Sequence, residues 1–588
     1  MLERIKTSAE AEARSWIADF GCSLASGDAA AVAALFVPDC HWRNLCGISW
    51  EIATFSGAGK LADELCQRAR KVGAGGLDVD TELLVPRRAV LAGQEVIEAI
   101  FRFETANGPA IGVVRLLPSS DAAPKAWTLS TLLDVDRISA TKSGNIEPAT
   151  HNRDFAKQNW LEQRRTETAF EGREPDVLVV GGGHAGISAA VELKRLGLDT
   201  LVIDRQQRVG DNWRLRYHGL KLHNKTPVNH LRYMPFPPNW PDYIPKDKIA
   251  NWLEAYVESM EVNFWTDTVF EGAEYNGSTQ TWMARIQRGN GSVRLLYPKH
   301  IVMATSVSGT PNIPTIPTIE KFVGKVLHSS QFAAGAQWRG KSVVVMGTGT
   351  SAHDICQELQ ANGADVTMVQ RSPTLVVNVD PSAQLYDKTY LGNGPPVEVR
   401  DLLNASVPLE VVKASHRLIT REVRELDAPL LSRLERAGFR LEFGEDGTGW
   451  PLKFRTRGGG YYFNVGCSEL IADGKIRLIQ ASDIRQFVGD GLLLGDGSTL
   501  QADLVVLATG YKGQDHIVGS LFGAEVAARV GSIWGFDADT QELRNMWSRT
   551  KQPGLWFTGG SFSQCRIYSR FLALQVDAIE HGRLDKAS

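Results

Sequence analysis

Two glycine turns, each placed between an apolar strand and a helix, most constrain the fold of this chain. The first follows DVLVV and reads GGGHAG, and the second follows SVVVM and reads GTGTSA. In such a unit the first glycine permits a tight turn and the second lets the backbone approach a pyrophosphate. The third small residue lets the helix pack closely on the strand. One such turn serves one dinucleotide, so the pair predicts two dinucleotide-binding domains.

The first turn has the full context of a dinucleotide site. Gly181, Gly183 and Gly186 form G-x-G-x-x-G, and the helix after them leads into the strand DTLVID, which ends in Asp204. A carboxylate at this spacing can hold the hydroxyls of a ribose, while the helix N-terminus receives phosphates. The alternative is a structural turn without a ligand, which the joint presence of strand, helix and acid disfavours.

The second turn predicts a nicotinamide cofactor. Gly347, Gly349 and Ala352 form G-x-G-x-x-A, in which alanine still permits close helix packing. The following strand ends in Gln370 and Arg371 instead of an acid. A guanidinium there suits the 2′-phosphate of NADP and can also stack on adenine. The first site therefore reads as the FAD site and the second as an NADPH site. NADH is an alternative, because no second basic residue is close in the sequence.

A separate domain precedes the first turn. The segment AEAEARSWIADFGCSLASGDAAAVAALF has apolar residues at helical spacing, and HWRNL, VIEAIFRF, AIGVVRLLP and AWTLSTLLDVDRIS read as short strands. Two or three helices followed by a meander of strands predict an α+β domain with a curled antiparallel sheet. This order, with LFVPDCHWRNL, resembles the SnoaL-like cone. We expect a scaffold, lid or dimerisation element, because no convincing His/Asp pair is present.

We therefore expect an α/β chain with two Rossmann-like domains, preceded by the α+β cone-like domain, since 588 residues exceed one core. A polar linker carrying one helix, NRDFAKQNWLEQRRTETA, separates the two parts. A helical insert at 397–439 is expected to cap the site. The expected ranges are 1–145 for the cone, 146–172 for the linker, 173–335 for the first part of the FAD-binding domain, 336–500 for the NAD(P)-binding domain with its insert, and 501–588 for the second part of the FAD-binding domain.

Three further motifs resemble those of flavin-containing and Baeyer–Villiger monooxygenases. Gly210 and Trp213 in VGDNW match the G-G-x-W-type segment that follows the ribose acid. FVGKVLHSSQF, which contains His328, matches F-x-G-x-x-x-H-x-x-x-F and ends in Phe, as in the flavin-containing form. Thr509 and Gly510 in LATGY match the A-T-G-x segment that returns to the FAD domain. His328 is expected to orient the segment between the domains rather than to transfer protons.

The resemblance implies an FAD-dependent, NADPH-consuming monooxygenase. In that family NADPH reduces the flavin, dioxygen adds to its C4a carbon, and one oxygen atom passes to a small organic substrate. The hydroperoxyflavin requires a dry site and a fixed hydrogen-bond donor. The position that matches the family's asparagine in LKLHNKT is Asn224, and His223 stands next to it. These two are the candidate catalytic residues, with a turn residue as the alternative for Asn224.

The sequence leaves the substrate open. Two reactions remain open for a monooxygenase: oxidation of a ketone to an ester, and oxygenation of a sulfur or nitrogen atom. The N-terminal extension resembles that of some ketone-oxidising flavin-containing monooxygenases and so favours ketones. The alternatives are an NAD(P)H oxidase that releases hydrogen peroxide and an oxidative decarboxylase like those of plant auxin synthesis. A pyridine nucleotide–disulfide reductase shares the two-domain plan, but this sequence has no C-x-x-C motif.

Charge and composition limit the classes of partner that this chain is expected to bind. The formal net charge of -3 gives no overall attraction to nucleic acid or acidic lipid. The 7 cysteines are scattered without the spacing of a metal site, so no metal is expected. Neither a signal peptide nor a membrane-spanning apolar run is evident. We expect a cytoplasmic enzyme whose partners are a small-molecule substrate and O2, with a homodimer formed through the N-terminal domain.

Overall fold

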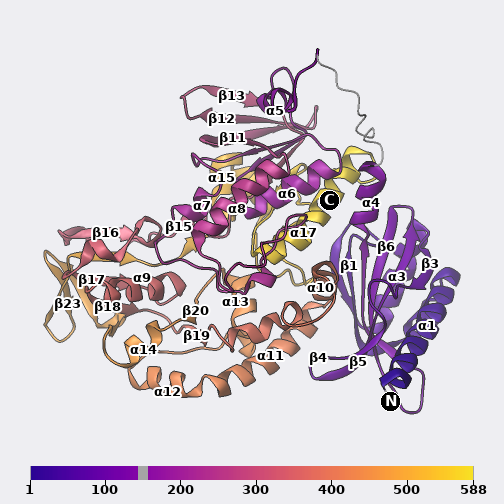
Figure 1. Ribbon diagram of the computed structural model, residues 1–588, viewed down its shortest axis with the longest axis horizontal. Coiled ribbons are helices and arrows are strands. Elements are labelled where there is room, and N and C mark those ends of the chain that lie inside the picture. The colour runs from indigo at the N-terminus through magenta and orange to yellow at the C-terminus, as the bar shows by residue number, and fades with distance from the viewer. Residues whose placement is uncertain (1, 144–155, 587–588) are drawn as a thin grey trace.

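The computed structural model describes residues 2–143 and 156–586. Figure 1 shows four regions: the N-terminal domain at the right, one group of helices and strands at the top, a second at the left, and a row of helices along the bottom. Helix α17, near the C-terminus, lies between the top group and the N-terminal domain. Among the described residues, no helix combines the length and the apolar character needed to cross a membrane.

The N-terminal domain is a seven-stranded sheet packed with helices. Strand order is β2-β1-β7-β6-β5-β3, with β4 paired to β5. The pairing is antiparallel except between β1 and β7, which run parallel, so the expectation of a wholly antiparallel sheet is wrong at that pair. The helices are α1 (Leu2–Ser26), α2 (Ala29–Ala34), α3 (Ala58–Val72) and α4 (Val135–Ser143), and the strands are β1 (Phe36–Leu45), β2 (Ile52–Ser56), β3 (Gly75–Val79), β4 (Arg87–Leu91), β5 (Gln94–Thr105), β6 (Gly108–Leu117) and β7 (Lys125–Leu133).

Two local features of this domain differ from the sequence interpretation. Helix α3 comes between β2 and β3 rather than before the strands, and the end of AWTLSTLLDVDRIS forms α4 instead of continuing β7. Asp28, the N-cap of α2, accepts a hydrogen bond from Ala31 N, as its place in SGD predicted. Strand β6 is buried from Ala110 to Leu116, so both faces of the sheet are covered there. The resemblance to the SnoaL-like cone stays a prediction.

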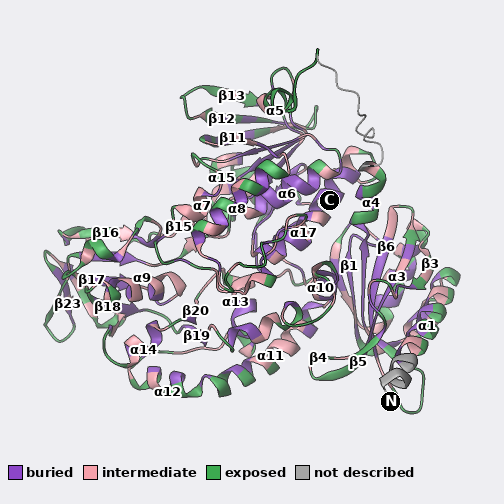
Figure 2. Ribbon diagram, viewed as in Figure 1, coloured by how far each residue is buried: buried purple, intermediate pink, exposed green. Residues whose placement is uncertain are grey.

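The first glycine turn lies on a parallel sheet of order β10-β9-β8-β14-β27. Its inner strands β8, β9 and β14 are predominantly apolar runs and are buried throughout, because a parallel sheet is covered on both faces. Figure 2 shows buried residues along much of α6 as well. Helices α6 and α17 pack directly against each other. The elements are β8 (Val177–Val180), α6 (His184–Arg195), β9 (Thr200–Ile203), β10 (Asn263–Trp265), β14 (His300–Met303), β27 (Leu555–Phe557) and α17 (Phe562–Glu580), with a three-stranded sheet of β11 (Thr268–Asn276), β12 (Thr281–Arg288) and β13 (Val293–Leu296) beside them.

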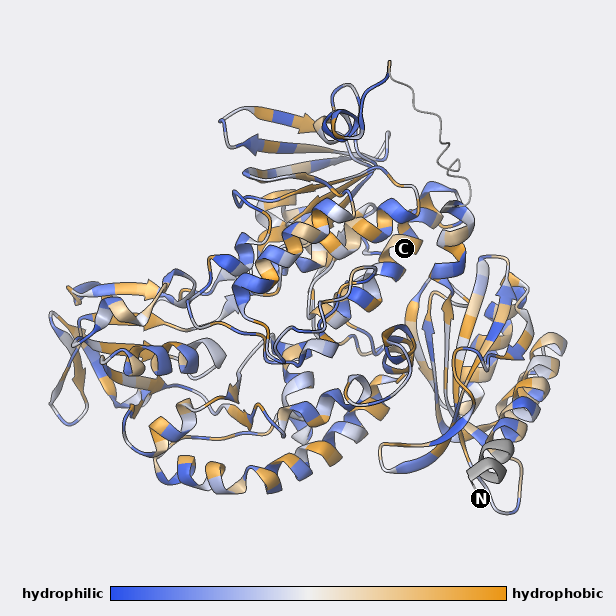
Figure 3. Cartoon of the chain, in the orientation of Figure 1, coloured by the Kyte–Doolittle hydropathy of each residue, from blue (hydrophilic) through white to orange (hydrophobic). Residues whose placement is uncertain are grey.

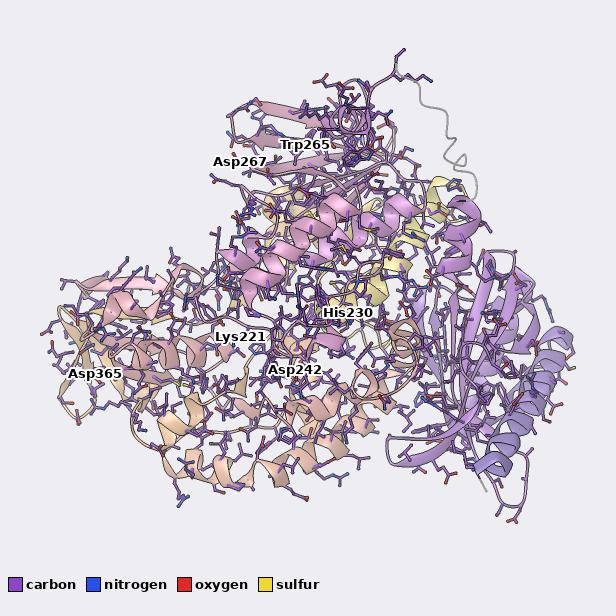
Figure 4. The ribbon with its side chains drawn as sticks, viewed as in Figure 1. Lys221, His230, Asp242, Trp265, Asp267 and Asp365 are labelled. Atoms are coloured by element: carbon purple, nitrogen blue, oxygen red, sulfur yellow. The ribbon has the colours of Figure 1, made fainter. Side chains whose placement is uncertain are left out.

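The second turn lies on another parallel sheet, of order β16-β25-β17-β18-β21. Its elements are β16 (Lys325–His328), β17 (Ser342–Met346), α9 (Thr350–Ala361), β18 (Asp365–Gln370), β21 (Arg477–Gln480) and β25 (Leu504–Leu507). Strands β16 and β25 belong to this sheet, although both fall in ranges that the sequence assigned to the FAD-binding domain. The second sheet thus draws its strands from residues 325–507. Figure 4 labels Asp365, at the start of β18.

The insert forms the row of helices at the bottom of Figure 1, as predicted. It contains α10 (Val397–Ala405), α11 (Leu409–Leu426) and α12 (Ala428–Arg436), followed by α13 (Gly449–Arg457). In Figure 3, α11 and α12 alternate hydrophobic and hydrophilic residues, which is the pattern of helices buried on one face. A buried ion pair between Asp401 and Arg566, at 2.7 Å, fastens α10 to α17. Arg566 also donates to the carbonyl of His230, which Figure 4 labels near the centre of the molecule.

Shorter elements complete the chain. The linker helix α5 begins at Trp160, with Asn159 as N-cap, whereas the sequence predicted a helix from residue 152; residues 152–155 of that prediction lie outside the described residues. The others are α7 (Asp211–Arg214), α8 (Lys246–Ser259), α14 (Cys467–Ala472), α15 (Asp515–Phe522), α16 (Ala524–Val530), β15 (Thr310–Pro311), β19 (Leu375–Asn378), β20 (Tyr461–Asn464), β22 (Ile484–Val488), β23 (Gly491–Leu494), β24 (Thr499–Gln501), β26 (Tyr511–Lys512) and the 3-10 helix η5 (Ala383–Tyr390).

Candidate functional site

The first turn requires its glycines for steric reasons. Gly181 has φ +106, and a Cβ added there would lie 2.6 Å from the carbonyl oxygen of Ala304. A Cβ on Gly186 would lie 1.9 Å from the carbonyl oxygen of Gly181. No side chain fits at either position without moving the backbone. The turn is therefore held closed by packing of β8, α6 and the end of β14 against one another.

The N-terminus of α6 is free to bind an anion. Its N-cap is Gly183, and no side chain caps the helix. Helix N-termini carry unpaired N–H groups and a partial positive charge, which together suit phosphate. Asp204 stands beside the turn, where its carboxylate accepts hydrogen bonds from Gly182 N at 2.6 Å and from Gln206 N at 2.8 Å. The two groups predicted to bind the phosphates and the ribose, namely the N-terminus of α6 and the carboxylate of Asp204, are thus adjacent.

A cavity of about 670 Å³ opens in front of this turn. Two buried polar atoms on its wall lack a partner among the described residues, namely Trp213 Nε1, a donor, and Nδ1 of His184. A ligand that offers both acceptors and hydroxyls would satisfy these atoms, and FAD does so. The lining includes Gly181, Gly183, His184, Asp204, Asn212, Trp213, Ala304, Thr305, Tyr511 and Gly560.

Gly210 serves this cavity indirectly. It has φ +87, and a Cβ there would lie 2.4 Å from the carbonyl oxygen of Ala250 in α8. The close contact between this turn and α8 fixes the start of α7, which carries Trp213 onto the cavity wall. The glycine and the tryptophan of VGDNW therefore act together, one as a packing requirement and the other as a lining residue.

His184 is a lining residue that motif reasoning missed. Its ring stacks on Phe562 with centroids 4.2 Å apart and lies near Trp213. Its Nε2 is 2.9 Å from the carbonyl oxygen of Gly560, so Nε2 is the donor and Nδ1 is an acceptor. Burial lowers the pKa of His184, which keeps the ring neutral. His184 thereby links the first turn to the start of α17. Its place inside the glycine motif could have marked it.

The N-terminus of α17 differs from that of α6. Ser561 caps it, with Oγ accepting a hydrogen bond from Gln564 N. Gly559 and Gly560, which precede the cap, line the cavity. The turn before α17, and not the capped helix N-terminus, therefore lines this cavity.

The second turn repeats the geometry of the first. Gly347 has φ +130, and a Cβ there would lie 2.3 Å from the carbonyl oxygen of Ala508. Gly349 is the N-cap of α9, which no side chain caps, and Ala352 is fully buried in the helix–sheet packing. Both predicted dinucleotide turns therefore present an uncapped helix N-terminus at the carboxyl end of a parallel strand, where nucleotides bind such sheets.

Arg371 follows β18 and is exposed, as expected of a group that awaits a phosphate. A second basic residue, Arg440, lies beside it: its guanidinium donates to the carbonyl oxygen of Arg371 at 2.6 Å. Gln370 is buried and exchanges hydrogen bonds with the backbone of Arg440, which holds it there. The sequence could not show this pair, because the insert separates the two arginines in the chain.

Arg371→Ala and Arg440→Ala are each expected to weaken NADPH use far more than NADH use. A charge-assisted contact to a phosphate contributes about 1.5–3 kcal/mol, or roughly 10- to 150-fold in kcat/KM. Steady-state kinetics with both nucleotides measures the change. Arg477→Ala is the matched control, because Arg477 is an exposed arginine at the opposite end of the neighbouring strand. Equal losses with both nucleotides would assign the arginines to adenine stacking or folding.

The A-T-G-x segment joins the two sheets as the sequence indicated. Thr509 Oγ1 donates to the carbonyl oxygen of Asn312 at 2.6 Å, and Asn312 N donates to the carbonyl oxygen of Gly510 at 2.9 Å. His328 Nε2 lies 3.1 Å from the same Gly510 oxygen, while its Nδ1 accepts from Ser330 N. Burial lowers the pKa of His328. These contacts are those that the predicted orienting role of His328 requires, and the role itself stays a prediction.

The earlier counterpart of this segment, ATSV, has Ser306 where glycine is usual. Ser306 has φ +71, so the backbone keeps the left-handed conformation that glycine favours. The substitution therefore leaves the turn intact, at the cost of some backbone strain.

Asn224 and His223 lie apart from the cavity in front of the first turn. Asn224 Nδ2 donates to the carboxylate of Asp387 in η5 at 2.6 Å, and neither residue is among those lining that cavity. Burial raises the pKa of Asp387 to about 6. His223 stacks on Phe463, and burial lowers its pKa to about 4, so the ring is neutral at neutral pH. Asn224 thus links the FAD-side loop to the segment that leads into the insert.

Comparisons with known proteins agree with this architecture. A family model described as pyridine nucleotide-disulphide oxidoreductase matches residues 178–390. The rice (Oryza sativa subsp. japonica) indole-3-pyruvate monooxygenase YUCCA1 is 27% identical over 353 residues, covering 60% of this chain and 79% of the rice protein. A probable indole-3-pyruvate monooxygenase, YUCCA10 of Arabidopsis thaliana, is also 27% identical, covering 58% of this chain and 82% of its own.

Solved structures share the fold at low identity. The open crystal structure of cyclohexanone monooxygenase superposes with a TM-score of 0.51 at 18% identity, covering 69% of this chain and 88% of that one. Cyclohexanone monooxygenase from Rhodococcus sp. Phi1 bound to NADP+ gives 0.51 at 17% identity, covering 69% and 85%.

The disulfide-reductase description covers the shared two-domain plan rather than the chemistry, because all 7 cysteines are free in the described residues. The chain therefore combines both dinucleotide turns and the linking motif with sequence similarity to indole-3-pyruvate monooxygenases and with a fold shared with cyclohexanone monooxygenase.

Proposed function

We propose that this chain is an FAD-dependent, NADPH-consuming monooxygenase that inserts one atom of O2 into a small organic substrate. The observation that carries the proposal is the pair of uncapped glycine turns on two separate parallel sheets. The carbonyl oxygen of Gly510, which His328 and Asn312 hold, ties the two sheets together. Two dinucleotides in one chain allow a hydride to pass from one to the other, and the flavin, when bound, supplies the activation of dioxygen.

The residues of the chain would divide the work as follows. The N-terminus of α6 holds the flavin pyrophosphate and Asp204 holds the ribose, while α9 with Arg371 and Arg440 holds NADPH. The rings of His184, Trp213 and Phe562 contact one another, and those of His184 and Trp213 line the cavity, where they would help to exclude water from a bound flavin.

A ketone is the substrate class that we propose. The relatives with the higher identity are named for indole-3-pyruvate, which contains a ketone, and the N-terminal extension favoured the same class. Oxygenation of a sulfur or nitrogen atom is the alternative. The cytoplasmic location and the homodimer stay predictions.

Product analysis with ¹⁸O2 tests the proposal. Purified protein is incubated with NADPH and a panel of small ketones and sulfides, and NADPH consumption, hydrogen peroxide and labelled product are measured together. A monooxygenase yields product carrying one ¹⁸O atom and at most one product per NADPH. Consumption of NADPH with hydrogen peroxide as the sole product, across the panel, would instead identify an NAD(P)H oxidase.

A further inference from the structure

A second cavity, of about 530 Å³, lies between the N-terminal domain and the rest of the chain. The N-terminal domain supplies Arg43, Trp50 and residues 51–53 to its wall. Residues 530–551, helix α13 and helix α17 supply the remainder. A scaffold, lid or dimerisation role is what the sequence predicts for the N-terminal domain, and no sequence motif indicates the cavity that this domain helps to build.

Arg455, near the end of α13, is the unmatched charge on this wall. It lies deep in the protein, where burial lowers its pKa, yet it keeps some accessible surface because it borders the cavity. In the described part of the chain, no carboxylate lies within ion-pair distance of its guanidinium and no hydrogen bond from it is formed. A buried guanidinium is costly unless an anion or acceptors satisfy its five N–H groups.

The acidic groups that could neutralise Arg455 are already engaged. Glu542 forms a bidentate pair with Arg43, at 2.6 and 2.8 Å, and also accepts from Thr54. Asp387 does not line the cavity; it accepts a hydrogen bond from the neutral amide of Asn224, and its carboxylate lies beyond ion-pair distance of Arg455.

The two other acidic residues on the wall are occupied as well. Glu51 pairs with Arg68 at 2.6 Å, and Asp537 accepts hydrogen bonds from Thr540 and Asp539 N. Among residues 2–143 and 156–586, therefore, no carboxylate forms an ion pair with the guanidinium that Arg455 presents to the cavity.

This cavity adjoins the one in front of the first glycine turn. We call the cavity in front of the first turn the flavin cavity. Phe454 lines the flavin cavity, and the next residue, Arg455, lines the second cavity. Gly560 lines the flavin cavity, and Gln564, in the first turn of α17, lines the second. The two cavities are thus separated only by neighbouring residues of α13 and by the first turn of α17. A molecule in the second cavity therefore lies beside the flavin site.

We infer that the second cavity binds the substrate, that the substrate is an organic carboxylate, and that Arg455 holds its carboxylate group. The inference rests on the proposed function and narrows it to acids that also carry an oxidisable group, such as a ketone. The N-terminal domain then closes the substrate site. A planar guanidinium recognises a carboxylate through two parallel hydrogen bonds, which fixes the orientation of the rest of the molecule.

The test is calorimetric titration of the flavin-loaded protein without NADPH, so that no turnover occurs. Two pairs of probes differ by exchange of a carboxylate for a methyl group: phenylpyruvate with phenylacetone, and 4-oxopentanoate with 2-pentanone. In the wild type, the acid of at least one pair is expected to bind about 10- to 100-fold more tightly than its methyl partner. Equal affinities, or no acid binding, in both pairs would overturn the inference whether or not the protein proves to be a monooxygenase.

Variants test whether Arg455 causes the tighter binding of the acids. Arg455→Gln is expected to abolish the acid preference and Arg455→Lys to retain part of it. Arg544→Gln is the matched control, because Arg544 lines the same cavity but is exposed at the surface. An unchanged preference in Arg455→Gln, or an equal loss in Arg544→Gln, would contradict the assignment. Circular dichroism checks each fold, and the wild-type comparison remains decisive if a variant does not fold.

Discussion

Gly186→Val is expected to purify as a folded protein without bound flavin, whereas the wild type should be yellow and should release FAD on denaturation. The Cβ of valine would lie 1.9 Å from the carbonyl oxygen of Gly181 and 3.2 Å from the Cβ of Ala304. Relief of that overlap must move α6 away from β8, which displaces the N–H groups that receive the pyrophosphate. The ratio of absorbance at 450 nm to that at 280 nm measures flavin content.

A control separates loss of the site from general damage. Gly277→Ala, in the turn between β11 and β12, changes a glycine whose added Cβ meets no atom within 4 Å, so its flavin content should equal that of the wild type. Far-ultraviolet circular dichroism verifies that Gly186→Val is folded. Full flavin content in Gly186→Val would remove the steric argument. A wild type that is colourless and does not take up FAD would overturn the assignment of the cofactor.

The sequence predicts those parts of the site whose residues belong to one continuous segment of the chain. Gly181, Gly186 and Asp204 belong to one continuous strand–turn–helix–strand unit, so their spacing alone indicates the dinucleotide site. The same holds for Gly347 and Ala352. The turn geometry agrees with the sequence pattern because each glycine avoids a steric conflict with a neighbour in the same unit or in the next strand of its sheet; nucleotide binding at these residues stays a prediction.

Residues from distant segments could not be predicted in this way. Arg440 reaches Arg371 only because Gln370 binds its backbone, and Arg455 borders a cavity whose opposite wall comes from the N-terminal domain. No periodicity or residue spacing in the sequence indicates either contact. The parallel pairing of β1 with β7 was missed for the same reason, since strand order depends on tertiary packing and not on the apolar pattern of each strand.

The second large effect is expected in Asn224→Ala, which tests the sequence prediction for Asn224 although this residue does not line the cavity in front of the first turn. If Asn224 is the donor that stabilises the activated oxygen, its loss should leave flavin reduction by NADPH intact. Removal of one such donor costs about 3 kcal/mol, so the ratio of oxygenated product to hydrogen peroxide should fall roughly 100-fold. Stopped-flow reduction of the flavin measures the first half of the reaction, and product and peroxide yields measure the second.

The hydrogen bond from Asn224 to Asp387 makes a sharper version of this experiment possible. Asp387→Ala removes the anchor and leaves the asparagine amide in place. If Asn224 acts directly on the oxygen species, only Asn224→Ala uncouples the reaction. If it acts by holding the loop against η5, both variants uncouple it equally. Full coupling in both would make Asn224 a turn residue, and the neutral ring of His223, which burial keeps unprotonated, would be the next donor to replace.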